Sequence, residues 1–182
     1  STEGLNLNYN ISRDLALADK DQQIKSNMFT LYLGKSFEGF KEALGFKESR
    51  GDYFIVNTLG YLGKYQFGSE TLRVIGIYNP NQFLYNPELQ EKAFTALCKV
   101  NKWILRKDIK RSVGKTINGI EITESGILAA AHLSGAGNVK KFLRSNGSRG
   151  FSDAYGSSIE SYLKKFKDYN VSSIVANQKA SV

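Results

Sequence analysis

The chain has 182 residues, a formal net charge of +8, one cysteine and one histidine. A lone cysteine excludes a disulfide within the chain, and with a lone histidine it excludes a Cys/His zinc site, so we expect no metal and no cofactor. No stretch approaches the roughly 20 apolar residues of a membrane span, which excludes a transmembrane segment.

The N-terminal residues, 1–35, are predicted to form a partly helical extension. Apolar side chains recur at helical spacing between Ile11 and Leu33. Ser36 then suits the cap of a helix that runs towards Glu48. Gly45 interrupts that pattern, so the end of this helix is expected near the glycine or a turn beyond it.

The middle of the chain carries clear start and stop signals. One helix is predicted from Ser69 to Ile75. Asn86–Pro87 combines a capping side chain with proline at the first helical position, and predicts a longer helix towards Arg106. The segment KTINGIEIT, residues 115–123, alternates isoleucine around Asn-Gly and indicates a β-hairpin.

Three more helices are predicted after the hairpin. Thr123 suits the cap of the first, which is broken near Gly135. The second starts at Val139, and the third opens at Ser157 or Ser158. The pattern of short helices with one hairpin is typical of a mainly α (α+β) fold.

These elements predict three parts of the chain. Residues 1–35 form the extension, residues 36–169 form one helical domain with a small β-hairpin, and residues 170–182 form a loose C-terminal tail. The length is sufficient for one domain with a substantial core.

The segment that follows the first predicted helix carries a spaced motif. Glu48–Ser49 is followed by Gly60, Gly63 and Gln66. This resembles the signature of the lytic transglycosylase (SLT) and goose-type lysozyme group of the lysozyme-like superfamily. In that group a Glu–Ser pair ends a helix, and a glycine-punctuated loop leads to a Gly–Leu–Met–Gln step. Here the step reads Gly63–Lys64–Tyr65–Gln66, so the spacing is kept and the middle pair departs.

A second segment, residues 127–142, is similar to the Ala–Tyr–Asn–Ala–Gly–Pro–Gly element of the same group. His132 stands at the tyrosine and Leu133 at the asparagine, whereas Gly135 and Gly137 keep the two glycines. In the group this element joins two helices and lines the sugar groove.

A third segment, residues 157–166, is similar to the late Glu–Thr…Tyr segment of the group, and places a groove-lining tyrosine at Tyr162. The three segments keep their order and span residues 36–167. The resemblance therefore implies a lysozyme-like domain.

The resemblance also implies a function: cleavage of the β-1,4 bond between N-acetylmuramic acid and N-acetylglucosamine in peptidoglycan. Glu48 would be the general acid and base, since glycosidic cleavage needs a carboxyl that donates a proton to the leaving oxygen. Lytic transglycosylases then form a 1,6-anhydro end, whereas muramidases (lysozymes) use water held by a second carboxylate. Asp52 is the first candidate for that carboxylate, ahead of Asp153, Glu70 and Glu124. The expected substrate-binding residues are Ser49, Asn57, Gly63, Tyr65, Gln66, His132, Gly135 and Tyr162.

The partners implied are peptidoglycan glycan strands, and the compartment is periplasmic or secreted, although the chain opens without a leader pattern. A larger secretion, phage-like or toxin assembly fits the same activity. The alternative is a non-catalytic glycan-binding or structural module with a degenerate groove, which the departures at Lys64–Tyr65 and Leu133 favour. A nucleic-acid binder would rest on positive charge alone, without a recognised module, so no nucleic acid is expected.

Overall fold

A computed structural model describes residues 33–153 and 156–182. Contacts divide the chain into two units, Ser1–Gly34 and Lys35–Val182, one residue from the predicted boundary. The helices predicted between Ile11 and Leu33 lie, except for their last residue, outside the described residues. We therefore describe the second unit.

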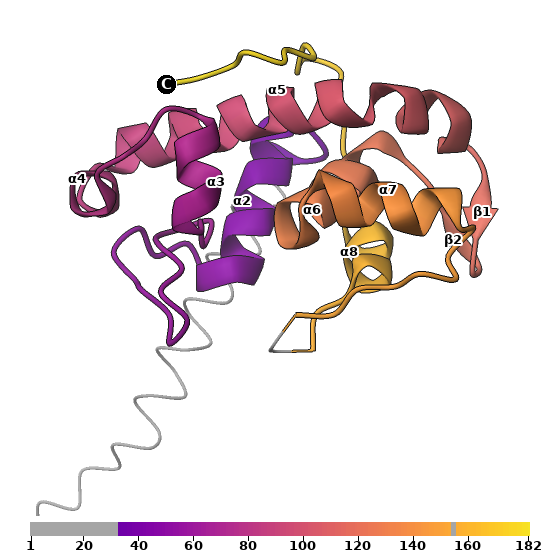
Figure 1. Cartoon of the computed structure of the whole chain (residues 1–182), viewed down its shortest axis with the longest axis horizontal. Helices are drawn as coiled ribbons and strands as arrows, with labels where there is room; N and C mark the ends of the chain where they lie inside the picture. Colours follow the sequence, from indigo (N-terminus) through magenta and orange to yellow (C-terminus); the bar gives the residue numbers. More distant parts are fainter. Residues whose placement is uncertain (1–32, 154–155) are drawn as a thin grey trace, which may run out of the picture. The chain divides into compact units, whose positions relative to one another are not determined.

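The second unit is mainly helical, as predicted (Figure 1). Within residues 33–153 and 156–182, no helix is both long and apolar enough to cross a membrane. In chain order the described elements are α2 (Phe37–Ser49), α3 (Ser69–Val74), α4 (Pro80–Leu84), α5 (Pro87–Ser112), β1 (Thr116–Ile117), β2 (Ile120–Glu121), α6 (Glu124–Ser134), α7 (Ala136–Arg144) and α8 (Ile159–Lys165).

Helix α2 begins where the sequence predicts, because the Ser36 hydroxyl accepts a first-turn N–H at 3.1 Å. It runs through Gly45 without a break. A Cβ at Gly45 would lie 2.8 Å from Cε of Lys64, so the glycine allows a close approach between helix and loop. The helix stops at Arg50, whose backbone is left-handed with φ of 57°. Glu48 therefore lies in its last turn.

Helix α5 is the long helix that runs along the top of Figure 1. Asn86 caps it as predicted, but it continues to Ser112, past the predicted end at Arg106. The short helix α4 is not among the helices predicted from the sequence. Its signal is the same as that of α5, since Asn79 caps it and Pro80 occupies its first turn.

Helix α6 is the centre of the core. Its residues 125–131 are all buried, and α5, α7 and α8 pack against it. Because residues 125–131 have no solvated face, they are small or apolar except Ser125, whose hydroxyl donates to the Phe166 carbonyl at 2.7 Å. Gly126 lets α8 come close, since a Cβ there would lie 2.9 Å from the Leu163 carbonyl oxygen.

The predicted hairpin is confirmed. Strands β1 and β2 are antiparallel, with Ile117 opposite Ile120. Asn118 and Gly119 both have positive φ, at 50° and 77°, as a two-residue turn of type I′ requires.

The C-terminal segment, residues 170–182, forms no helix or strand but is packed rather than loose. The Asn170 N–H donates to the Lys35 carbonyl at 2.6 Å, and the Asn177 N–H donates to the Lys99 carbonyl of α5 at 3.1 Å. Three of its side chains are buried: Val171, Ile174 and Ala180. The expectation of a loose tail is wrong, because these apolar side chains complete the core.

Candidate functional site

A cavity of about 700 Å³ opens beside the C-terminal end of α2. Three segments far apart in the sequence form its walls. They are the loop between α2 and α3, the last turn of α6 and the segment that follows α7. The lining includes two carboxylates, Glu48 and Asp153.

Glu48 is half-buried, and one oxygen of its carboxylate accepts a hydrogen bond from a helix far away in the sequence. The Tyr162 hydroxyl of α8 donates to Glu48 Oε1 at 2.5 Å. Burial raises the pKa of Tyr162, and the Glu48 carboxylate raises it further, so this phenol stays a donor at neutral pH. The two residues are predicted site residues, and the structure brings them together.

Ser49, the neighbour of Glu48, is used inside the protein. Its hydroxyl donates to the Lys64 carbonyl at 2.7 Å, and the Gly45 carbonyl lies 3.3 Å away. The bond fastens the end of α2 to the following loop. We therefore assign Ser49 to positioning Glu48 rather than to substrate contact.

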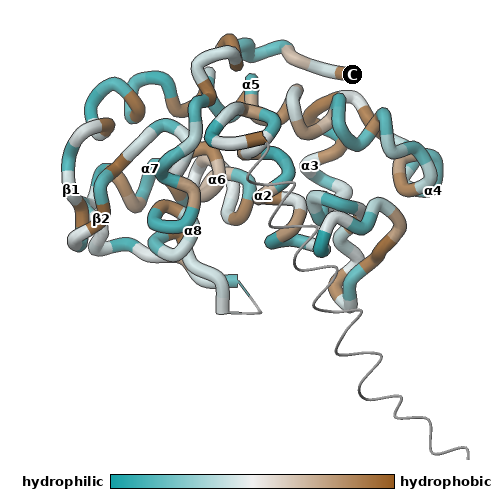
Figure 2. The backbone as a smooth tube through the Cα atoms, turned by 180° about the vertical axis from the view of Figure 1, so that it is seen from behind, coloured by the Kyte–Doolittle hydropathy of each residue, from teal (hydrophilic) through white to brown (hydrophobic). Residues whose placement is uncertain are grey.

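The loop between α2 and α3 forms one wall of the cavity and is hydrophobic along its exposed part (Figure 2). Asn57 folds it, because its Oδ1 accepts the N–H groups of Leu59 and Tyr61, both at 2.9 Å. Leu59 is 57% exposed and Tyr61 is 42% exposed, so this wall offers apolar surface next to a side-chain amide. Gln66, with φ of 53°, ends the wall, and its Nε2 donates to the Gly63 carbonyl at 3.0 Å.

Gly63 is buried and does not line the cavity. Its φ is 73°, and a Cβ at this position would lie 2.2 Å from Oε1 of Gln90. Gln90, which sequence reasoning missed, is fully buried in α5 and accepts the Lys64 N–H at 3.0 Å while donating to the Tyr53 carbonyl at 2.8 Å. The glycine thus serves the docking of the loop onto α5, and not a sugar.

Lys64 and Tyr65, where the motif departs from the group that it resembles, take part in a buried network of ion pairs and hydrogen bonds. Lys64 is 3% exposed, and its Nζ lies 2.6 Å from Glu42 Oε1 and 2.8 Å from Glu91 Oε1. Tyr65 is fully buried, and its hydroxyl donates to Glu91 Oε2 at 2.7 Å. Burial alone would raise the pKa of Glu91, but the hydrogen bonds from Lys64 and Tyr65 outweigh it and lower the pKa to about 2. The Tyr65 side chain does not reach the cavity, so the expected substrate contact is wrong.

His132 lines the cavity from α6. Its Nε2 lies 2.6 Å from the Tyr65 carbonyl oxygen, and since a carbonyl only accepts, Nε2 carries the proton. Burial lowers the pKa of His132, and the Glu48 carboxylate opposes this only in part. The ring is therefore neutral at pH 7, with an unprotonated Nδ1 that is buried and has no partner among residues 33–153 and 156–182.

Two further predicted residues lie elsewhere. Asp52 is exposed, accepts the Phe54 N–H at 2.8 Å and does not line the cavity, so it is badly placed for the second carboxylate. Asp153 is the carboxylate that shares the cavity with Glu48, and it also accepts the Ser157 N–H at 2.8 Å. Gly135 joins α6 to α7 with φ of 80°, and it is exposed outside the lining.

Glu48, Asn57, Gln66 and His132 thus meet at one cavity, with Tyr162 behind Glu48. Within the described part of the chain, no three His, Cys, Asp or Glu side chains gather as a metal site would need. Comparison with protein-family models gave no match, and comparison with curated proteins and with solved structures gave none either.

Proposed function

We propose that residues 35–182 form a lysozyme-like glycosidase that cleaves the β-1,4 bond between N-acetylmuramic acid and N-acetylglucosamine in peptidoglycan. The observation that carries this proposal is the position of Glu48 in the cavity wall, with Tyr162 fixing one of its oxygens. The spaced resemblance around Glu48 supports it, because it selects the same glutamate without reference to the cavity.

The cavity has the size and lining that a sugar chain needs. Its volume of about 700 Å³ lies within the roughly 300–1,000 Å³ of small-ligand sites. Leu59, Tyr61 and Leu133 offer apolar surface for pyranose faces, and the amides of Asn57 and Gln66 suit hydroxyl and acetamido groups.

In the proposed reaction Glu48 donates a proton to the bridging oxygen of the glycosidic bond, and the bond breaks on the muramic acid side. The resulting carboxylate then takes a proton from the attacking hydroxyl. If the attacker is the C6 hydroxyl of the same sugar, the product has a 1,6-anhydro end. If it is water, the product is a reducing end, and Asp153 is the residue that we propose to hold that water.

A second candidate function is a glycan-binding module without turnover. Leu133 favours it, because an apolar side chain lines the cavity where the resembling family has an amide. Both functions take peptidoglycan strands as partner and place the protein at the cell wall, either periplasmic or secreted, alone or in a larger secretion, phage-like or toxin assembly.

The decisive experiment measures release of soluble muropeptides from purified peptidoglycan by wild type and by Glu48→Gln. Loss of a general acid costs about 10²–10⁴-fold in rate, and we expect a loss of that size. Asp52→Asn is the matched control, because that carboxylate is exposed outside the cavity, and it should keep near wild-type activity. Equal release by wild type and Glu48→Gln would refute the assignment.

Mass analysis of the products separates the two reaction types, since anhydro ends are lighter than reducing ends by one water. If hydrolysis is found, Asp153→Asn should lower the rate while Asp52→Asn does not. Sedimentation with intact peptidoglycan tests the module: tight binding by wild type without any release of fragments would favour it.

A further inference from the structure

A second pocket lies between α5 and α7 and shares no lining residue with the cavity beside Glu48. Its volume is about 320 Å³. Trp103 and Ile104 supply apolar walls, while Arg106 and Lys107 of α5 and Lys140 of α7 supply positive charge. We call it the α5–α7 pocket.

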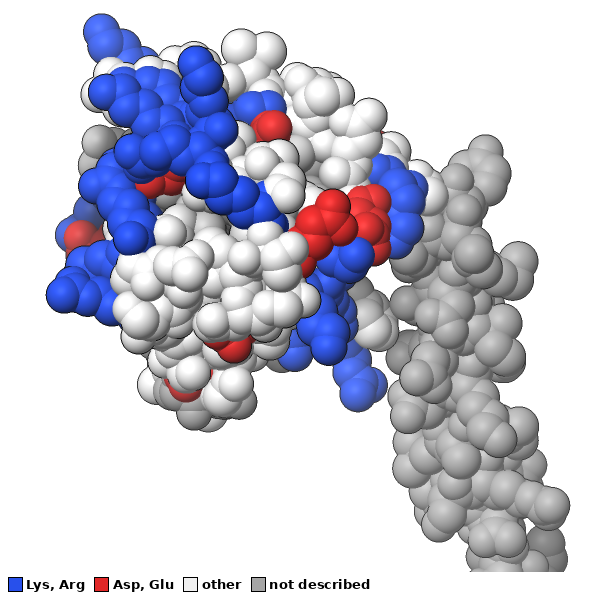
Figure 3. Space-filling model, turned by 90° about the vertical axis from the view of Figure 1, so that its right-hand side faces the viewer, with Lys and Arg blue, Asp and Glu red and all other residues white. Residues whose placement is uncertain are grey.

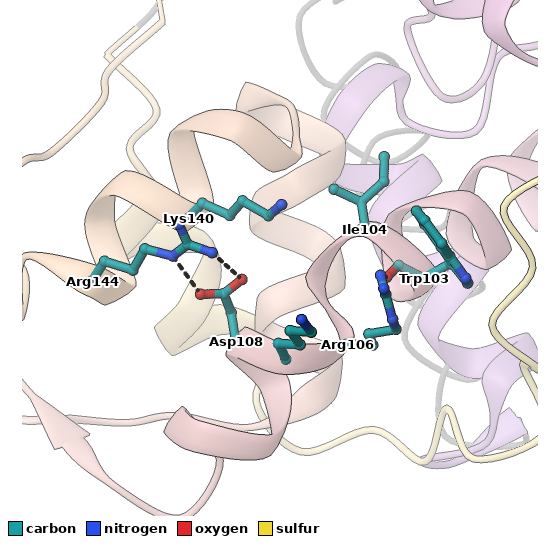
Figure 4. A pocket seen from close by; sticks show the side chains of 7 residues that line it. Trp103, Ile104, Arg106, Asp108, Lys140 and Arg144 are labelled. Atoms are coloured by element: carbon teal, nitrogen blue, oxygen red, sulfur yellow. Dashed lines mark hydrogen bonds and ion pairs between the residues drawn. The ribbon is translucent and has the colours of Figure 1, made fainter.

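Helical spacing explains why these side chains converge. Trp103 is followed three and four residues later by Arg106 and Lys107, which places all three on one side of α5. Lys140 and Arg144 are likewise four residues apart on α7. Figure 4 shows both reaching from α7 towards α5, with Trp103 and Arg106 on the α5 side.

Asp108 is the one acidic residue that lines the pocket, and its carboxylate is already paired with two arginines. Asp108 is 1% exposed, and its Oδ1 accepts from Arg144 Nε at 2.9 Å and from Arg111 Nη2 at 2.5 Å. Burial alone would raise the pKa of Asp108, but the two guanidinium groups outweigh it and lower the pKa. Asp108 therefore stays ionised and orients Arg144 at the pocket wall.

The remaining cations have no such partner. Arg106, Lys107 and Lys140 form no ion pair with any residue of segments 33–153 and 156–182. Figure 3 views the molecule from the right-hand side of Figure 1, the end at which α5 and α7 finish. Many Lys and Arg side chains gather on one part of this face. Arg106, Lys107 and Lys140 line the pocket without an acidic partner in the described part of the chain, and they favour an anionic ligand.

The apolar wall of the α5–α7 pocket limits which kinds of anionic ligand can fit it. The Arg106 guanidinium lies over the Trp103 ring, 3.9 Å from its centroid, and its Nη1 donates to the Trp103 carbonyl at 2.8 Å. One face of the ring is therefore covered, and the volume of about 320 Å³ leaves room for one small ligand rather than for the successive stacked bases of a single-stranded nucleic acid. A small body with an apolar patch beside the cations fits the space better.

We propose that the α5–α7 pocket binds a phosphate group carried on a sugar or polyol. A phosphate offers several acceptor oxygens to cations that approach from two helices, and guanidinium and ammonium groups are its usual partners. The sugar or polyol lies against Trp103 and Ile104. This site is independent of the proposed glycosidase activity.

Trp103 is the single tryptophan of the chain, so intrinsic fluorescence reports on the pocket directly. The full chain is titrated at physiological salt with glucose 1-phosphate, with glucose and with inorganic phosphate. We expect a saturable change with glucose 1-phosphate, a midpoint at least about tenfold weaker with inorganic phosphate, and no response to glucose. A response to glucose equal to that of its phosphate would overturn the proposal, as would equal binding of inorganic phosphate.

Substitution separates a built site from a general positive field. Arg106→Gln/Lys140→Gln should weaken the midpoint for glucose 1-phosphate at least about tenfold, while leaving Arg144 on Asp108 so that no buried charge is stranded. Lys164→Gln/Lys165→Gln on α8 removes the same charge from exposed positions and should leave the midpoint unchanged. Equal weakening by both pairs would overturn the proposal. A competition with an oligonucleotide tests the other class of ligand. If the oligonucleotide displaces glucose 1-phosphate at a tenfold lower concentration, and does not bind the Arg106→Gln/Lys140→Gln variant, the pocket is a nucleic-acid site and the proposal is overturned.

Discussion

Replacing Glu91 by glutamine is expected to destabilise the fold strongly at neutral pH and much less in acid. Glu91 is 25% exposed and receives Lys64 Nζ at 2.8 Å and the hydroxyls of Tyr65 and Tyr53, each at 2.7 Å. Glutamine keeps the shape but loses the charge. Lys64, which is 3% exposed, would then keep Glu42 as its one remaining acidic partner among the described residues.

The size of the effect follows from proton linkage. The pKa of Glu91 is about 2 in the folded protein, against 4.5 in an unfolded chain. That difference corresponds to about 3 kcal/mol of the free energy of unfolding at pH 7. Because the folded pKa is the lower one, the stabilisation is complete above pH 4.5 and is lost as the pH falls towards 2, leaving about 1 kcal/mol at pH 3.

The assay is urea unfolding of wild type and Glu91→Gln at pH 7 and pH 3. We expect a loss of about 3–5 kcal/mol at pH 7, since removing one partner of a buried pair strands the other, and a loss about 2 kcal/mol smaller at pH 3. Glu88→Gln on the same helix is the control, because its pair with Lys92 is exposed and should add little at either pH. A loss at Glu91 that does not change with pH would refute the reasoning.

Three other substitutions, with Gly60→Ala as the control for the first, test the site and the loop beside it. Gly63→Ala should lower the free energy of unfolding by about 2–4 kcal/mol. The new Cβ would collide with the buried Gln90 side chain, and alanine is strained in the left-handed backbone conformation of this position. Gly60→Ala, with φ of 83° and open space, should cost only about 1 kcal/mol, and equal losses in urea unfolding would contradict this difference. Tyr162→Phe should cost about 1.5–3 kcal/mol and lower muropeptide release, since Glu48 loses its donor; unchanged stability and release would count against that bond. His132→Gln should flatten the fall of stability between pH 7 and pH 5, because a folded pKa below 6.5 means that stability is complete above 6.5 and lost below it. An unchanged slope in urea unfolding would contradict the role of His132.

The helix starts were predictable because their signals are local. Ser36, Asn86 and Thr123 each accept an N–H from three residues ahead, and a capping side chain followed by its helix is visible within a few positions of the sequence. The Asn-Gly turn of the hairpin is equally local. The helix at Pro80 carries the same local signal, because Asn79 caps it and Pro80 stands in its first turn.

The supporting residues were not predictable, because their roles depend on contacts across the fold. Gln90 reads as a solvated position on an amphipathic helix. In the fold its amide bonds to Lys64 and Tyr53 of the docked loop, and to the carbonyls of Phe83 and Leu84 in α4. Tyr65 was assigned to sugar binding on its ring and its place in the motif. In the fold its ring stacks on Phe94, with centroids 4.2 Å apart, and it belongs to the core.

The position of Asp52 outside the cavity has a similar explanation. Asp52 is near Glu48 in sequence, but the turn after α2 points it to solvent, where it accepts the Phe54 N–H. Asp153 is distant in sequence and reaches the cavity because the segment after α7 folds back over it. Proximity along the chain was a poor guide to proximity in space.

The bond between Tyr162 and Glu48 joins side chains 114 positions apart. During synthesis the glutamate emerges long before its phenol partner, so nascent chains carry the acid without the group that aims it. The Glu48 carboxylate gains this donor only when α8 docks. A split or a circular permutation of the chain between these two positions would therefore have to restore this hydrogen bond across the new break.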